Sequence, residues 1–76
     1  MKELTNYELL NRISAIEGKR AGKPCIEGTR ITIYDIFSLL ASEMTITQIL
    51  DDFPHLTEDD IIACFVYVLV NNNIIV

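Results

Sequence analysis

The 76-residue chain has few of the side chains that build metal centres or nucleophilic sites. It contains one histidine, His55, and two cysteines, Cys25 and Cys64, which are far apart and belong to no CxxC pair. A zinc site needs about four Cys, His or acidic ligands, so we expect no metal ion, and no motif implies a cofactor. No serine or cysteine forms an evident triad pattern with His55 and an acid. We therefore predict that the protein is not an enzyme.

Basic residues are absent from the second part of the chain. Residues 31–76 hold seven acids and no lysine or arginine, whereas residues 1–30 hold six basic and four acidic residues. The two parts therefore carry net charges of −7 and +2, which give −5 in total. A positive surface for nucleic acid can come only from the first part. The six basic residues are Lys2, Arg12, Lys19, Arg20, Lys23 and Arg30.

Long apolar runs are also absent. The longest, Ile61–Val70, is about half of the roughly 20 residues that a membrane helix needs, and the polar start lacks the apolar stretch of a signal peptide. We expect a cytoplasmic protein with reduced cysteines and no membrane contact. The length predicts one domain, residues 1–76, which buries only about 60% of its unfolded surface. Since 50% of the residues are apolar, disorder is excluded, and association with a partner or a second copy is favoured.

The first third of the chain predicts a short helix and a strand. Thr5 and Glu8 have the spacing of a capping box, so we expect a helix from there to about Asn11. Residues 12–16 follow as a strand, in which Ile13 and Ile16 are apolar.

Glycines and a proline concentrate in residues 18–28, which predicts the main loop. The β-branched segment Arg30–Ile33 then indicates a second strand, which would pair with the segment around Ile13. We expect Arg30 to pair with a carboxylate and to fix the loop. The buried side chain of Ile26 and the hydroxyl of Thr29 are expected to hold the loop to the core.

Three helices are predicted in the remainder of the chain. Apolar residues recur at helical spacing from Tyr34 onward. Thr45 and Gln48 form a second capping box, Pro54 ends that helix, and Thr57 caps the next. The expected helices cover residues 34–43, 45–53 and 57–70; Asn71, Asn72 and Asn73 end the last one, and residues 74–76 are a candidate terminal strand.

The last helix is apolar almost all round, although a surface helix normally shows one apolar stripe. One interpretation is a central core helix. The other is a core helix that also forms an interface with a second copy or with a partner. The residues assigned to that interface are Ile61, Phe65, Val66 and Leu69.

The last two predicted helices and their short turn have the outline of a helix-turn-helix. The second helix begins with Glu58, Asp59 and Asp60, however, and these acids would face the phosphates of DNA. The predicted fold class is mainly α with a small β element, a helix-turn-helix-like three-helix core with a short hairpin.

Four of the basic residues gather in and beside the glycine-rich loop, and they suggest an anion contact. The anion could be nucleic-acid phosphate or an acidic partner surface, and a solvated loop is the structural alternative. The segment matches neither a phosphate-binding loop nor a GxGxxG fingerprint. The four candidate contact residues are Lys19, Arg20, Lys23 and Arg30.

The run GKPCIEGTRI at residues 22–31 resembles the signature of the family known as domain of unknown function 433. The similarity extends over residues 12–70 and leaves 71–76 as a C-terminal extension. The motif residues are Gly22, Lys23, Pro24, Ile26, Gly28, Thr29, Arg30 and Ile31.

This resemblance implies a mostly helical, homodimeric, VapB-like antitoxin that neutralises a small PIN-like ribonuclease toxin by direct contact. It also implies that some relatives bind their operator DNA. We therefore expect an antitoxin, with a DNA-binding regulator and a structural dimer subunit as alternatives. The chain departs from the family pattern at Glu43, where glycine is usual, and in the lack of basic residues after Arg30.

Overall fold

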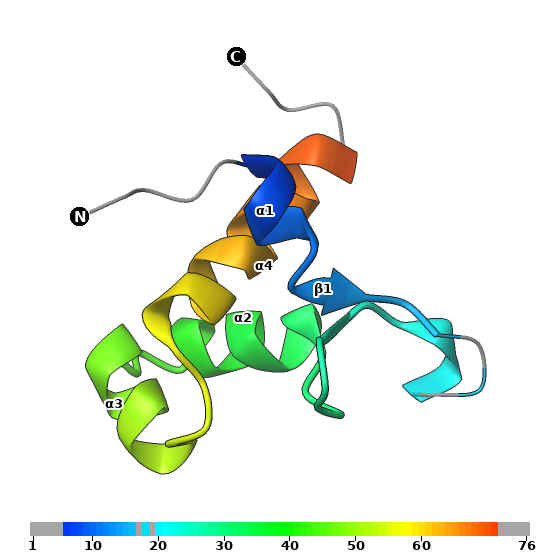
Figure 1. Ribbon diagram of the computed structural model, residues 1–76. Coiled ribbons are helices and arrows are strands. Elements are labelled where there is room, and N and C mark those ends of the chain that lie inside the picture. The colour runs from blue at the N-terminus through cyan, green and yellow to red at the C-terminus, as the bar shows by residue number, and fades with distance from the viewer. Residues whose placement is uncertain (1–5, 17, 19, 72–76) are drawn as a thin grey trace.

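The computed structural model of the protein describes residues 6–16, 18 and 20–71 (Figure 1). Within these residues the chain is mainly helical with one small antiparallel sheet, so the predicted fold class is confirmed at that level. The elements are α1 (Asn6–Leu10), β1 (Ile13–Ser14), the 3-10 turn η1 (Arg20–Gly22), β2 (Cys25–Ile26), α2 (Ile33–Ala41), α3 (Ile46–Asp52) and α4 (Glu58–Asn71).

Helix α4 is the element on which the others pack. It contacts α1, α2, α3 and β1, and its residues Ile61, Ala63 and Cys64 have no exposed surface. The prediction of a core helix in this segment is therefore confirmed. One hydrophobic cluster joins all these elements; its buried members are Leu9, Ile13, Ile26, Ile33, Ile36, Ile49, Leu56, Ile61, Ala63 and Cys64.

The sheet differs from the predicted hairpin. Strand β1 pairs with β2, so that Ile13 lies opposite Ile26. The strand at the position of Ile13 is confirmed, but its partner is not residues 30–33. In that segment Thr32 forms only an isolated bridge with Cys25.

The predicted strand at residues 30–33 is wrong because Thr32 begins a helix. The hydroxyl of Thr32 accepts a hydrogen bond from the backbone N–H of Asp35 at 3.0 Å, and the Asp35 carboxylate accepts one from the N–H of Thr32 at 2.9 Å. This capping box satisfies two N–H groups that a helix start otherwise leaves unpaired. Helix formation from Ile33 therefore prevails over the β propensity of the local sequence.

The other two predicted helix starts are confirmed. Thr45 and Gln48 form both hydrogen bonds of a capping box before α3. Before α4, the N–H of Thr57 donates to the Asp60 carboxylate at 2.9 Å, and the N–H of Asp60 donates to the Thr57 hydroxyl. The helix extends one residue further than predicted, through Asn71.

Helix α2 ends at Ala41 with Ser42 as its C-cap, and Glu43 follows at the position where the resemblance expects glycine. The φ of Glu43 is +68°, in the left-handed region. Its N–H donates to the Leu40 carbonyl at 3.0 Å, and the N–H of Met44 donates to the Leu39 carbonyl at 3.2 Å. These two bonds are those of a Schellman motif, so the turn of the family is formed here by a non-glycine residue.

Two predictions concern parts of the chain outside the described residues. They are the N-cap at Thr5 and the terminal strand at residues 74–76. Among the helices that the structure describes, none combines the length and the apolar character needed to cross a bilayer.

Candidate partner-binding site

The segment that follows β1 is built on left-handed backbone. Arg20, Ala21 and Gly22 have φ values of +48°, +57° and +76°, and Gly28 has a φ of +78°. The N–H of Lys23 closes the first turn by donating to the Arg20 carbonyl at 3.1 Å. Gly22 and Gly28, which belong to the glycine-rich segment predicted as the main loop, both adopt the left-handed conformation that glycine tolerates best.

Arg20, and not Arg30, fixes this loop to the helical core. Its Nη1 donates to the carbonyl of Arg30 at 2.8 Å and to Oδ2 of Asp35 at 3.3 Å. The pKa of Asp35 is lowered, chiefly by the hydrogen bond from the backbone N–H of Thr32, and the charge of Arg20 acts in the same direction. Among the described residues Arg30 forms no ion pair, and the guanidinium of Arg20 occupies the nearby carboxylate of Asp35.

The second half of the loop is closed by Thr29, as predicted. Its hydroxyl donates to the carbonyl of Ile26 at 2.8 Å and accepts from the N–H of Ile31 at 3.0 Å. Ile26 is only 2% exposed, so it anchors this turn in the core. The motif residues therefore form a hydrogen-bonded scaffold.

This scaffold exposes two of the four candidate contact residues as unpaired cations. Lys23 and Arg30 are both exposed, and within the described part of the chain neither side chain forms an ion pair. Arg20 is engaged in the contacts above, and Lys19 lies outside the described residues. Among the candidate contact residues that the structure describes, the positive charge available to a partner thus lies on Lys23 and Arg30.

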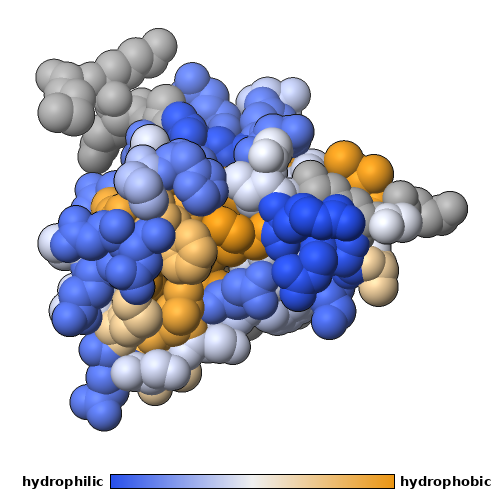
Figure 2. Space-filling model, turned by 90° about the horizontal axis from the view of Figure 1, so that it is seen from below, coloured by the Kyte–Doolittle hydropathy of each residue, from blue (hydrophilic) through white to orange (hydrophobic). Residues whose placement is uncertain are grey.

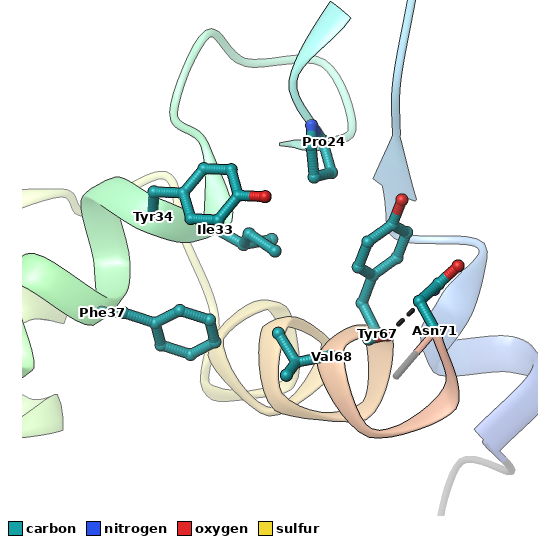
Figure 3. A pocket seen from close by; sticks show the side chains of 7 residues that line it. All are labelled: Pro24, Ile33, Tyr34, Phe37, Tyr67, Val68 and Asn71. Atoms are coloured by element: carbon teal, nitrogen blue, oxygen red, sulfur yellow. Dashed lines mark hydrogen bonds between the residues drawn. The ribbon is translucent and has the colours of Figure 1, made fainter. Parts of the chain in front are cut away.

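A groove opens beside this loop, between the start of α2 and the end of α4 (Figure 3). Its volume is about 430 Å³. Tyr34 of α2 and Tyr67 of α4 stand on opposite sides of it, and Asn71 donates from Nδ2 to the carbonyl of Tyr67 at 2.9 Å. The lining residues are Pro24, Ile33, Tyr34, Phe37, Tyr67, Val68 and Asn71. They come from three separate segments, which is why no sequence motif indicates the groove.

The residues assigned to a dimer interface divide between core and surface. Ile61 is fully buried within the chain, so its assignment to an interface is wrong; Val66 packs partly against the core. Phe65 and Leu69 are each 42% exposed, together with Ile62 at 37%. The interface therefore remains a prediction for the outward face of α4.

Exposed apolar surface extends beyond the outward face of α4. The ring of Phe65 lies 5.2 Å from that of Phe37, a groove residue, so the outward face of α4 continues toward the groove. Figure 2, which views the molecule from below, shows an apolar strip between the side that holds α3 and the side that holds the loop.

One of the three acids at the start of α4, Asp60, serves the fold. Asp60 is only 9% exposed, and its Oδ1 accepts from Nη1 of Arg12 at 3.1 Å. Glu58 is exposed and Asp59 is half-buried in the same turn. No group of three or more His, Cys, Asp or Glu residues suited to a metal ion occurs among the residues described.

These features define a small, mainly helical protein with a two-stranded sheet, a hydrogen-bonded loop and an open groove. The family model "Protein of unknown function (DUF433)" matches residues 13–68, and the chain belongs to this family.

A solved structure agrees with that assignment. The chain is similar to the crystal structure of a DUF433 member protein from Anabaena variabilis ATCC 29413, with 25% sequence identity and a TM-score of 0.76. The match covers 83% of this chain and 62% of the other, so the present chain spans less than two thirds of that protein. No curated protein matches the sequence.

Proposed function

We propose that this protein is an antitoxin-like interaction module that neutralises a PIN-like ribonuclease by direct contact. The observation that supports the proposal is the exposure of Lys23 and Arg30, which have no ion-pair partner among the described residues, on a loop held by Arg20 and Thr29. The partner class follows from the resemblance of residues 22–31 to the family signature.

The basic loop of this protein is complementary in charge to the acidic active site of the proposed nuclease. A nuclease of this kind uses acidic side chains and divalent cations, so its active site is negatively charged when the metal is absent. The guanidinium of Arg30 offers a planar pair of donors that suits a carboxylate. An arginine inserted there would pair with the metal-binding acids and displace the metal. Arg20 is unsuited to this role because its guanidinium already binds Asp35 and the carbonyl of Arg30.

Affinity capture from native lysate, followed by an inhibition assay on single-stranded RNA, tests the proposal. The wild-type chain should recover the nuclease in stoichiometric amount and inhibit it. The variant Arg30→Ala should need about tenfold more protein for half inhibition, which corresponds to about 1.4 kcal/mol. Arg30→Lys should fall between the two because it keeps the charge but loses the paired donors.

The matched control is Asp51→Asn, which changes one charge on the exposed surface of α3. It should inhibit like the wild-type chain. Full inhibition by both Arg30→Ala and Lys23→Ala would exclude the loop mechanism. Recovery of upstream DNA in low salt without any nuclease would instead favour the DNA-binding regulator.

A further inference from the structure

One nitrogen atom of Arg20 contacts two groups at the start of α2. Its Nη1 donates to the carbonyl of Arg30 at 2.8 Å and to Oδ2 of Asp35 at 3.3 Å. Because both acceptors bind the same nitrogen, the main chain of Arg30 lies close to the carboxylate of Asp35. An arginine side chain is long and has many rotamers. The guanidinium of Arg30 is therefore a competitor of Arg20 for this carboxylate.

The structure resolves this competition in favour of Arg20. Arg30 is exposed, and the ion pairs within the described part of the chain do not include it. Oδ2 of Asp35 also accepts a hydrogen bond from the N–H of Thr32 at 2.9 Å. A second guanidinium beside this carboxylate would meet the repulsion of the positive charge of Arg20. The side chain of Arg20 thus disfavours an ion pair between Arg30 and Asp35.

The backbone around Arg20 is strained where it supports these contacts. Arg20 and Ala21 both have left-handed φ values, +48° and +57°, although neither is glycine. Such strain persists where the surrounding structure determines the conformation, and it is common at functional sites. Here the N–H of Lys23 closes the turn on the Arg20 carbonyl at 3.1 Å. The strained turn fixes the backbone from which the Arg20 side chain extends to α2.

We infer that Arg20 is a positioning residue, which occupies Asp35 and thereby leaves the guanidinium of Arg30 to the nuclease. This inference rests on the proposed function. Without Arg20, the side chain of Arg30 pairs with Asp35 in its own chain. An exposed ion pair of this kind is weak, so it withdraws Arg30 from the partner in only part of the molecules. The apparent affinity falls in proportion to the fraction in which Arg30 stays free.

The test measures the affinity of full-length variants for the nuclease recovered with the wild-type chain. Arg20→Ala should bind about two- to sixfold more weakly than the wild type. Arg20→Lys keeps a positive charge beside Asp35 and should bind within about twofold of the wild type. Adding Asp35→Asn to Arg20→Ala should tighten binding again, because the competing carboxylate is gone. If Arg20 only anchored the loop, loss of a further contact at the same place would not restore affinity.

The matched control combines Arg20→Ala with Asp51→Asn, which makes the same change of charge on the exposed surface of α3. This double variant should bind like Arg20→Ala. Thermal unfolding of every variant establishes that the fold is intact. A second readout needs no nuclease. In the free protein, NMR relaxation at Nε of Arg30 should show a more ordered guanidinium in Arg20→Ala than in the wild type.

The outcomes separate the inference from the proposed function. If Arg20→Ala binds as tightly as the wild type, the positioning role is wrong while the proposed function stands. The same conclusion follows if Asp35→Asn fails to restore the affinity of Arg20→Ala, or if Asp51→Asn restores it equally. If the wild-type chain binds no nuclease, both the inference and the proposed function are wrong.

Discussion

The backbone conformation of Glu43 lowers the stability of this small domain. Its left-handed φ completes the Schellman turn after α2 and allows Met44 to pack against the core. A non-glycine residue in this region costs roughly 1–2 kcal/mol. The exposed Glu43 side chain has no hydrogen bond within the described residues that compensates for this strain.

Glu43→Gly should therefore stabilise the protein. We expect a gain of about 0.5–1 kcal/mol, since the strain relief is partly offset by the greater unfolded-state entropy of glycine. Urea unfolding measures the change. Glu43→Ala is the control, because it removes the carboxylate and keeps the strain. An equal gain in both variants would show that charge, and not backbone conformation, is the cause.

Cys64 is the clearest case of a side chain whose chemistry is suppressed by its surroundings. It has no exposed surface, and burial raises its pKa to about 12, with the nearby charge of Asp60 acting in the same direction. The thiolate is the reactive form, so Cys64 should resist iodoacetamide at pH 8 in the folded protein. Mass spectrometry after labelling should show modification only in denaturant. Rapid labelling of native Cys64 would contradict the burial.

At the scale of elements, one ion pair joins the first part of the chain to the last helix. Arg12 lies between α1 and β1, and it reaches Asp60 in the first turn of α4. The same carboxylate also accepts the N–H of Thr57. Asp60 therefore caps α4 and ties it to the N-terminal segment at once.

Asp60→Ala should destabilise the protein by about 1–3 kcal/mol, because it removes the cap and leaves Arg12 half-buried without its partner. Thermal or urea unfolding measures the loss. Asp59→Ala removes a carboxylate from the same turn and should cost much less. A comparable loss in the two variants would indicate a general effect of helix-terminal charge.

The capping box of α2 predicts a dependence on pH. The pKa of Asp35 lies below its ordinary value of 3.8 in the folded protein. Its contribution to stability is therefore present above about pH 4 and is lost as the pH falls through the lower, folded-state pKa. Unfolding of the wild type and Asp35→Asn should differ at pH 6 and converge on acidification. A constant difference down to pH 2 would contradict this assignment.

The sequence predicts some elements well and others poorly for a physical reason. Capping boxes are local, so Thr45 and Thr57 are recognised from neighbours three residues away. The segment Arg30–Ile33 carries two conflicting local signals, β-branched residues and the box of Thr32 with Asp35, and the box prevails. The pairing of Arg12 with Asp60 spans 48 positions, and no local pattern encodes it.

In the candidate site, too, local contacts are predicted from the sequence and long-range contacts are not. The hydroxyl of Thr29 and the anchor of Ile26 act within their own loop and are predicted from the motif. The choice between Arg20 and Arg30 for the structural ion pair depends on the fold that brings Asp35 to the loop. The groove depends on the approach of α2 to α4, so only the three-dimensional structure reveals it.

At the scale of the whole molecule, the outward face of α4 exposes three large apolar side chains. Ile62, Phe65 and Leu69 lie at helical spacing along it and are all substantially exposed. Burying such a row against a second copy removes apolar area from water, which stabilises the pair by about 25 cal/mol per Å² before the costs of association.

We therefore predict a homodimer that Leu69→Asp dissociates without unfolding each chain. Sedimentation equilibrium measures the mass, and circular dichroism reports the fold. Tyr7→Asp places the same charge on α1 and should leave the dimer unchanged. A wild-type chain that sediments as a folded monomer would refute the prediction.

The contact between Arg20 and Asp35 has a consequence for the kinetics of recognition. Asp35 follows Tyr34 in α2, and the N–H of Ile33 donates to the carbonyl of Pro24 at 3.0 Å. The loop and the groove are thus tied to the same end of one helix. A partner that engages both meets a preformed surface and loses little entropy in ordering it. Loss of the ion pair between Arg20 and Asp35, which does not itself touch the partner, would weaken the contacts of the partner with both the loop and the groove. It would therefore shorten the lifetime of the complex.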